Sequence, residues 1–137
     1  MGLTTKLYSS NPHLRKITPC TYLSIRWLPP REGWFKMNTD GSSNFTQTYT
    51  GAGGVIRNHE GTWVMGFTQN LGYGTNNDVE LWDIKTCLEL ATKLEIKLLK
   101  MEIDSIFVVN ALKDCYVKFL NHKTLIASCR LLIQQFE

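Results

Sequence analysis

The sequence predicts a single α/β domain in which helices pack on a mixed β-sheet. Two observations carry this prediction. Three consecutive segments alternate apolar and polar residues as half-buried strands do, and the period then lengthens to that of an amphipathic helix. Strands are expected at about 34–42, 51–58, 62–70 and 100–104, and helices at about 78–98, 106–116 and 123–136.

The three early strands are expected to form an antiparallel meander. Alternation in the first strand gives one face Phe35, Met37 and Thr39 and the other face Lys36, Asn38 and Asp40. Residues 58–61 supply the next turn, because Gly61 tolerates a left-handed backbone. Glycines at 51, 53 and 54 indicate that another backbone or a ligand approaches the second strand closely.

A long helical pattern follows the meander. Its inward side is expected to carry Glu80, Ile84, Cys87, Leu88, Ala91, Leu94, Glu95 and Leu98. A right-handed crossover through this helix makes the strand at 100–104 parallel to the first strand. The last helix is expected to place Leu125, Cys129, Leu132 and Phe136 on its apolar side.

Composition excludes several classes of protein. The 43% hydrophobic and 20% charged content is that of a globular chain, and 137 residues suit one domain. The net charge of +3 is too small to indicate nucleic-acid binding by itself, and the four cysteines lack the spacing of a metal site. No apolar run is long enough to span a bilayer, and the N-terminus lacks the apolar core of a signal peptide. An intracellular protein of the nucleus or cytoplasm is therefore expected, without secretion.

The first part of the chain differs from the rest. Residues 1–26 show no sustained period and are interrupted by prolines, so we expect a poorly structured leader or linker. The domain is expected to cover residues 27–137.

Three acids stand where separate elements of this fold could meet. Asp40 and Asp104 become neighbours if their strands are adjacent and parallel, and Glu80 lies in the first turn of the long helix. Three carboxylates at one place repel one another unless a cation neutralises them, so the pattern favours a magnesium site. Each acid also has a structural alternative: a turn at Asp40-Gly41, a capping box of Asn77 with Glu80, or a helix cap at Asp104.

Residues from about 27 to 137 resemble a plant-type ribonuclease H domain. The resemblance rests on motifs in family order, namely Trp27-Leu28-Pro29-Pro30, Gly33–Ser42, Gly51–Asn58, Val79-Glu80-Leu81-Trp82 and Glu102-Ile103-Asp104-Ser105. Domains of this family occur alone in plants and at the end of retroelement polyproteins.

The resemblance implies a ribonuclease H-like mixed sheet with the strand order 3-2-1-4-5. It also implies hydrolysis of the RNA strand of an RNA–DNA hybrid with Mg²⁺, for which Mn²⁺ can substitute. Asp40, Glu80 and Asp104 match family acids that are both catalytic and metal-binding.

The resemblance further implies which residues contact the hybrid. Thr75 would bind a phosphate, and Asn76 and Asn77 would reach base edges in the minor groove. The backbone of Gly41 and Ser42 would lie near the RNA sugar. For Asn77 this contact competes with a role as helix cap.

The chain departs from the family towards its C-terminus. The family's fifth strand and last helix, which carry a mobile histidine and a fourth acid, would follow Glu137. We therefore expect a bare edge on the strand at 100–104 and weakened hydrolysis, with Mn²⁺ more effective than Mg²⁺. His122 and Asp114 do not stand at the family positions, and Asp83 replaces a small apolar residue.

Three functions stay open at this point. The first is a metal-dependent nuclease of reduced activity, acting as a monomer without membrane association. The second is a catalytically dead module that binds RNA–DNA hybrids or double strands. The third is a retroelement-derived fragment without a stable fold.

Overall fold

The computed structural model describes residues 3–4, 26–43, 50–113 and 122–136, and for residues 3–4 and 40–43 it describes the backbone alone. The strands are β1 (Leu3–Thr4), β2 (Phe35–Ser43), β3 (Thr50–Arg57), β4 (Trp63–Gly72) and β5 (Leu99–Glu102). The helices are α1 (Asn76–Lys93), α2 (Ile106–Lys113) and α3 (Lys123–Ile133).

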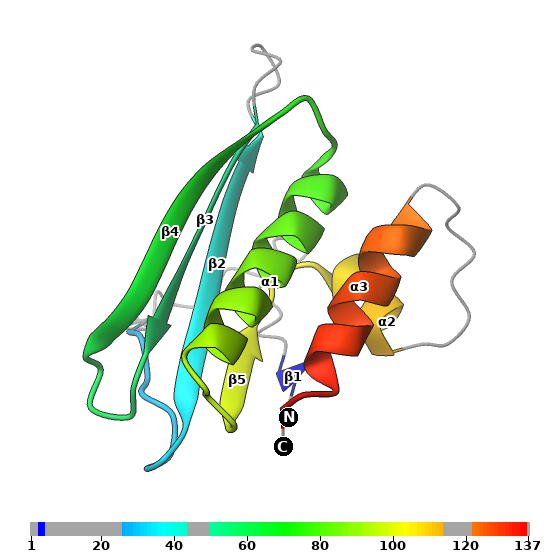
Figure 1. The fold of residues 1–137 in the computed structure, drawn as a ribbon. Helices are drawn as coiled ribbons and strands as arrows, with labels where there is room; N and C mark the ends of the chain where they lie inside the picture. Colours follow the sequence, from blue (N-terminus) through cyan, green and yellow to red (C-terminus); the bar gives the residue numbers. More distant parts are fainter. Residues whose placement is uncertain (1–2, 5–25, 44–49, 114–121, 137) are drawn as a thin grey trace, which may run out of the picture.

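The strands form one sheet in the order β1-β5-β2-β3-β4 (Figure 1). β2, β3 and β4 pair antiparallel, which confirms the predicted meander. β5 returns parallel to β2, and its ladder ends where Asn38 lies opposite Glu102. The carboxyl ends of β2 and β5 therefore point to the same edge of the sheet.

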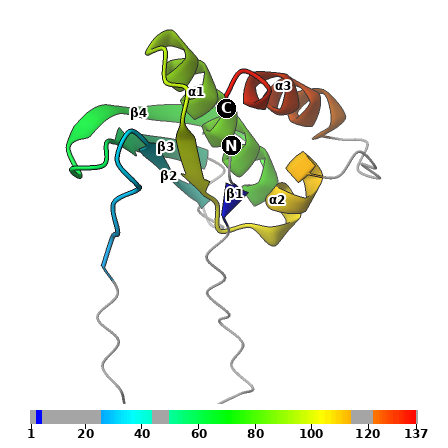
Figure 2. The ribbon, with the colours of Figure 1, turned by 90° about the horizontal axis from the view of Figure 1, so that it is seen from below.

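The three helices lie on one side of the sheet (Figure 2). α1 packs on β2 and β3, and α3 packs against α1. The core between these layers is apolar and includes Met37, Ile56, Leu81, Ile84, Leu88, Leu99, Met101, Ile126 and Cys129. None of the helices in the described ranges is both long and apolar enough to cross a bilayer.

The first helix ends earlier than its periodicity predicts. α1 stops at Lys93, and Glu95 adopts a φ of 57° that breaks the helical path. Ile96 then turns back into the core, whereas Leu94 is 37% exposed. The prediction of inward helical positions beyond Ala91 was therefore wrong.

The apolar side of α3 is centred one residue away from the predicted stripe. Its fully buried residues are Ile126 and Cys129. The predicted Leu125, Leu132 and Phe136 are only partly buried around them. The last part of the predicted second helix, residues 114–116, lies outside the described residues.

The outer edge of β5 is paired along part of its length. The backbone of Leu3 lies parallel and opposite to Met101, and that of Thr4 opposite to Glu102. The expectation of a bare edge was therefore wrong at these positions, because a segment from the start of the chain supplies the missing backbone partners. Residues 5–25 of the predicted leader lie outside the described residues.

Of the β3 glycines, Gly54 allows α1 to pack closely; the neighbours that approach it are side chains, whereas the sequence indicated another backbone or a ligand. A Cβ atom at Gly54 would lie 2.6 Å from the Cys87 sulfur and 2.7 Å from the Phe67 ring, whereas one at Gly51 would meet nothing within 4 Å. The side chain of Cys87 is fully buried in the core. Gly54 thus sets the distance between the sheet and the helix that carries Glu80.

We expect Gly54→Ala to lower the free energy of unfolding by about 1–3 kcal/mol, because the added methyl group forces Cys87 and Phe67 apart. Gly51→Ala is the matched control and should change stability by less than about 0.5 kcal/mol. Urea denaturation of both variants measures the difference. Equal stabilities would mean that α1 is not held by close packing at this point.

Candidate metal and nucleic-acid site

Two of the three predicted acids lie together at the edge where β5 ends. Glu80, one turn into α1, is close enough to Asp104 for its charge to be felt, and it shares a hydrogen bond with Ser105. The Asp104 side chain is exposed. α1 and the β5–α2 connection therefore bring two carboxylates from distant parts of the chain to one place.

Neither acid serves the structural role that the sequence also allowed. The capping box of α1 consists of Thr75 and Asp78, so Glu80 lies beyond the cap, and the prediction of Asn77 as the cap was wrong. At α2, Ser105 rather than Asp104 accepts the backbone N–H groups: its Oγ accepts from Val108 at 3.3 Å. The structural alternatives to a functional role are thus removed for both carboxylates.

The environment of Glu80 disfavours its charge. Burial raises its pKa, the hydrogen bond with Ser105 lowers it, and the negative charge of Asp104 raises it further, so that the pKa lies above its ordinary value. Its Oε2 atom is buried without a hydrogen-bond partner among the described residues. Such an orphaned carboxylate oxygen beside a second carboxylate fits a divalent cation, which prefers oxygen ligands.

We expect Glu80→Gln to stabilise the metal-free protein at neutral pH. A raised folded-state pKa means that the stability linked to protonated Glu80 is fully present below the unfolded pKa and is lost as pH rises through the folded one. Gln mimics the protonated form, so the gain should be seen at pH 7, should shrink as pH falls through the raised folded-state pKa, and should be gone below the ordinary value of 4.5. Thermal unfolding in a chelator measures it; a variant less stable than the parent at pH 7 would contradict the unfavourable placement of the charge.

The backbone of Asp40 lies on β2 beside Gly53 of β3, two residues past the end of the β2–β5 ladder. Asp104 lies two residues past the end of β5, so each acid comes two residues after the last pair of the β2–β5 ladder. The side chains of Asp40 and Ser42 are not described; the backbones of Gly41 and Ser42 pair with Ala52 and Gly51. Among the side chains that are described, no three His, Cys, Asp or Glu residues form a metal-binding group.

The predicted hybrid-contacting residues form the start of α1, which begins at Asn76. Thr75 and Asn76 are exposed and Asn77 is half-buried. The Thr75 hydroxyl is engaged in the cap: it accepts from the Asp78 backbone at 3.2 Å and donates to Asp78 Oδ2 at 2.7 Å. A phosphate at Thr75 would therefore compete with Asp78 for this hydroxyl.

His122 joins this corner of the molecule through Asp78. Its Nε2 lies 2.6 Å from Asp78 Oδ1, and its ring meets Phe107 edge-on at 6.3 Å. Burial alone would raise the pKa of Asp78, but the hydrogen bonds from Thr75 and the contact with His122 outweigh it, so the pKa is lowered. The contact ties the start of α1 to the start of α3 and was not foreseen from the sequence.

We expect Thr75→Ala to cost about 1 kcal/mol of stability, because the first turn of α1 loses its capping oxygen. Thr75→Ser keeps the hydroxyl and should stay within about 0.5 kcal/mol of the parent. Asn77→Ala, which leaves the cap intact, should behave like the serine variant. If chemical denaturation showed a larger loss of stability for Asn77→Ala than for Thr75→Ala, Asn77 and not Thr75 would be the capping residue.

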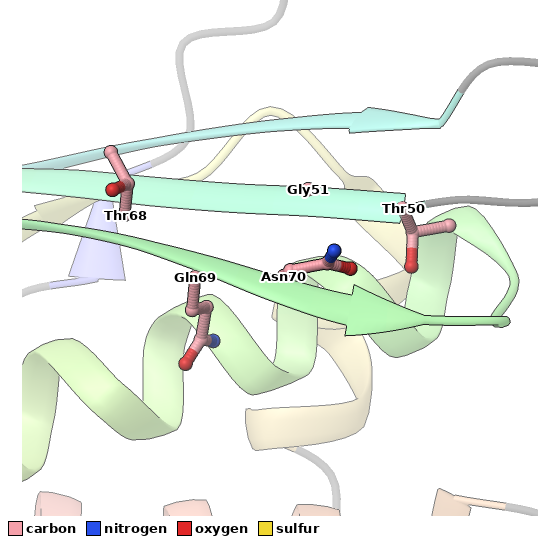
Figure 3. Close-up of a pocket in the computed structure, with 5 residues that line it drawn as sticks. All are labelled: Thr50, Gly51, Thr68, Gln69 and Asn70. Carbon is pink, nitrogen blue, oxygen red and sulfur yellow. The ribbon is translucent and has the colours of Figure 1, made fainter.

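A pocket of about 380 Å³ lies where β3 begins and β4 ends, lined by Thr50, Gly51, Thr68, Gln69 and Asn70 (Figure 3). Gln69 points towards α1 and accepts a hydrogen bond from Thr86, and Thr50 donates one to the Gly72 carbonyl at 2.8 Å. Two of its polar side chains thus serve the fold itself.

Comparison with known proteins agrees with this architecture. The family described as reverse transcriptase-like matches residues 38–137. The chain belongs to this ribonuclease H-like family. An Arabidopsis thaliana protein, provisionally named as a ribonuclease H, is 33% identical to this chain over 108 residues. The matched part covers 79% of this chain and 17% of that protein.

Solved structures show the same fold. The N-terminal RNase H domain of a Mycobacterium tuberculosis protein, solved as a fusion with maltose-binding protein, is 26% identical with a TM-score of 0.69, and the match covers 75% of this chain and 76% of that one. A ribonuclease H1 isolated from compost, solved with an RNA/DNA hybrid, is 21% identical with a TM-score of 0.63 and coverages of 74% and 78%. The predicted ribonuclease H-like fold is therefore confirmed.

Proposed function

We propose that this domain binds RNA–DNA hybrids and hydrolyses their RNA strand with Mg²⁺, using Asp40, Glu80 and Asp104 as the metal ligands. The observation that carries the proposal is the state of Glu80: it has no capping role, and its buried Oε2, close enough to Asp104 to feel its charge, has no hydrogen-bond partner in the part of the chain that the structure describes. Membership of a ribonuclease H-like family supports the choice of substrate.

In this proposal each residue has a separate task. Asp40 holds the cations from β2, Asp104 from the connection that follows β5, and Glu80 from the first turns of α1. When bound, the cations supply an activated water and offset the charge of the leaving oxygen. The carboxylates themselves orient this centre and keep it negative enough to attract divalent cations.

The start of α1 places the hybrid against these acids. Asn76 and Asn77 reach the minor groove, which is wide and shallow in an A-like duplex and is read through shape and hydroxyl groups. Thr75 contacts a phosphate when its hydroxyl leaves Asp78. Gly41 and Ser42 present their backbone to the RNA sugar.

The test is cleavage of an end-labelled RNA–DNA hybrid with Mg²⁺ or Mn²⁺, with double-stranded RNA and DNA as controls. We expect cleavage of the RNA strand of the hybrid alone. It should be faster in Mn²⁺, because Mg²⁺ demands near-ideal octahedral ligation that three carboxylates fill incompletely. Hybrid binding should weaken as salt rises, since phosphate contacts release counterions.

The alternative, a module that binds hybrids without turnover, predicts the same salt-dependent binding and no product in either metal. Binding that is equal for hybrids and single strands, and unchanged by salt, would contradict both functions. Asn76→Ala should weaken hybrid binding with little change in stability, because the cap belongs to Thr75.

A further inference from the structure

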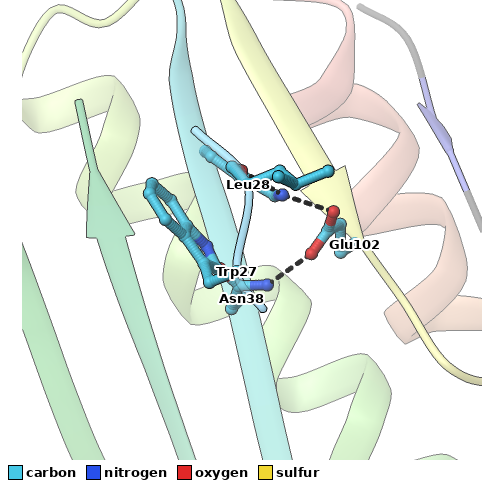
Figure 4. Close-up of polar contacts among 5 residues, drawn as sticks. Trp27, Leu28, Asn38 and Glu102 are labelled. Atoms are coloured by element: carbon cyan, nitrogen blue, oxygen red, sulfur yellow. Dashed lines mark hydrogen bonds and ion pairs between the residues drawn. The ribbon is translucent and has the colours of Figure 1, made fainter. Parts of the chain in front are cut away.

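A polar network lies on the sheet face turned away from the helices (Figure 4). The Asn38 amide donates to Glu102 Oε2 at 2.8 Å, so a side chain of β2 is bonded to its opposite partner on β5. Trp27, from the segment before β2, donates its indole N–H to Asn38 Oδ1 at 2.8 Å. Both ends of the Asn38 amide are thereby fixed.

A buried ion pair completes the network. Lys36 Nζ lies 2.5 Å from Glu102 Oε1, and these side chains are only 2% and 13% exposed. Lys36 also donates to the Leu28 carbonyl at 2.7 Å. Both oxygens of Glu102 therefore have partners within the protein, unlike Oε2 of Glu80, which has none among the described residues.

The Trp27 ring is held from several sides. The Lys36 ammonium lies 5.1 Å from its centroid and the Arg57 guanidinium 5.0 Å. A Cβ atom at Gly61 would lie 3.3 Å from the ring, which shows how closely the β3–β4 turn approaches it. A ring packed in this way gives its N–H a fixed direction towards Asn38.

The position of the network along the strands matters. Asn38 and Glu102 are the final opposed residues of the β2–β5 ladder, and beyond them no backbone pairing between these two strands is seen among the described residues. Asp40 comes two residues later on β2, about 7 Å further along that strand, and Asp104 comes two residues after β5 ends. The network is therefore the last contact between β2 and β5, among the described residues, before the chain reaches Asp40 and Asp104.

We propose that Trp27, Lys36, Asn38 and Glu102 form a brace that positions Asp40 and Asp104 for cation binding. Ligand spacing must be held closely for Mg²⁺, which tolerates little distortion of its octahedral geometry. These four residues are positioning residues, since they touch no cation themselves and act by holding the two acids in place. This inference rests on the proposed function for its cation, and Trp27 and Lys36 precede the residues matched by the family.

The first test compares Mn²⁺ affinity with stability. Asn38→Ala removes the link between the strands, and Trp27→Phe keeps a ring between Lys36 and Arg57 but removes the N–H donor. Leu132→Ala, a partly buried site on α3, is the control for a general loss of stability. Calorimetric titration should show Mn²⁺ binding weakened about 10–100-fold in Asn38→Ala and less in Trp27→Phe, with little change in Leu132→Ala. Affinities of both brace variants within twofold of the parent would overturn the brace.

The second test needs no cation. In ¹⁵N–¹H spectra of the metal-free protein, Asn38→Ala should shift the backbone ¹⁵N and ¹H signals of Asp104, which is far from residue 38 in sequence, and Leu132→Ala should leave them in place. If the parent fails to bind Mn²⁺ while these shifts occur, the proposed function fails, and only the structural link that the four residues make between β2 and β5 stands. Unshifted signals in Asn38→Ala would overturn the brace whatever the parent binds.

Discussion

Asp104→Asn is expected to lower metal-dependent cleavage of an RNA–DNA hybrid by at least about 100-fold. Loss of residues that merely support metal ligands costs 10–100-fold, and loss of a ligand should cost no less. Asn keeps the size of Asp104 but cannot offset the charge of a cation. Asp104 is exposed and does not cap α2, so the substitution should leave the fold unchanged.

The matched control for this loss is Glu89→Gln. Glu89 is also an exposed acid, on α1, and its carboxylate lies 3.6 Å from Lys85. An exposed pair of this kind contributes little to stability, and the variant should cleave like the parent. Asp40→Asn should lower the rate of cleavage as much as Asp104→Asn does. Full activity of either asparagine variant, with folding verified by thermal unfolding, would remove that residue from the metal site.

Lys36→Met is expected to lower the free energy of unfolding by about 3–5 kcal/mol, because it leaves the Glu102 carboxylate buried without its charged partner. The same argument applies to Glu102→Leu, which leaves the Lys36 ammonium buried without its charged partner. The double variant should be much more stable than the sum of the two losses predicts, since neither charge remains buried alone.

Denaturation of the four proteins of this cycle measures the coupling between the two residues. Lys85→Met is the control, because Lys85 pairs with Glu89 at the surface and its loss should cost less than about 1 kcal/mol. Additive losses for Lys36→Met and Glu102→Leu would show that the pair is not coupled. The brace would then lack its ionic part.

Local periodicity predicted the strands well, because alternation in β2, β3 and β4 reflects one covered face. It could not predict the end of α1. Apolar residues at 94 and 98 continue the helical pattern, and only the left-handed backbone at Glu95 shows where the chain turns. Pairing of Leu3–Thr4 with β5 depends on a contact between distant parts of the chain, which no local pattern reveals.

The start of α1 shows why the site was only partly predictable. Thr75 with Asp78 and Asn77 with Glu80 are overlapping capping patterns of the same spacing, so the sequence favours neither. The structure selects the first pair and leaves Glu80 for another role. The contacts of Trp27, Lys36 and His122 join separate elements and carry no signature in sequence.

The central claim is that Asp40, Glu80 and Asp104 hold divalent cations together. Anomalous diffraction from crystals of this chain grown with Mn²⁺ tests it most directly, since the metal is located independently of any activity. We predict a peak within bonding distance of carboxylate oxygens from all three residues, and its loss in Asp104→Asn. A peak that touches none of these carboxylates, or no peak at saturating Mn²⁺, would contradict the claim.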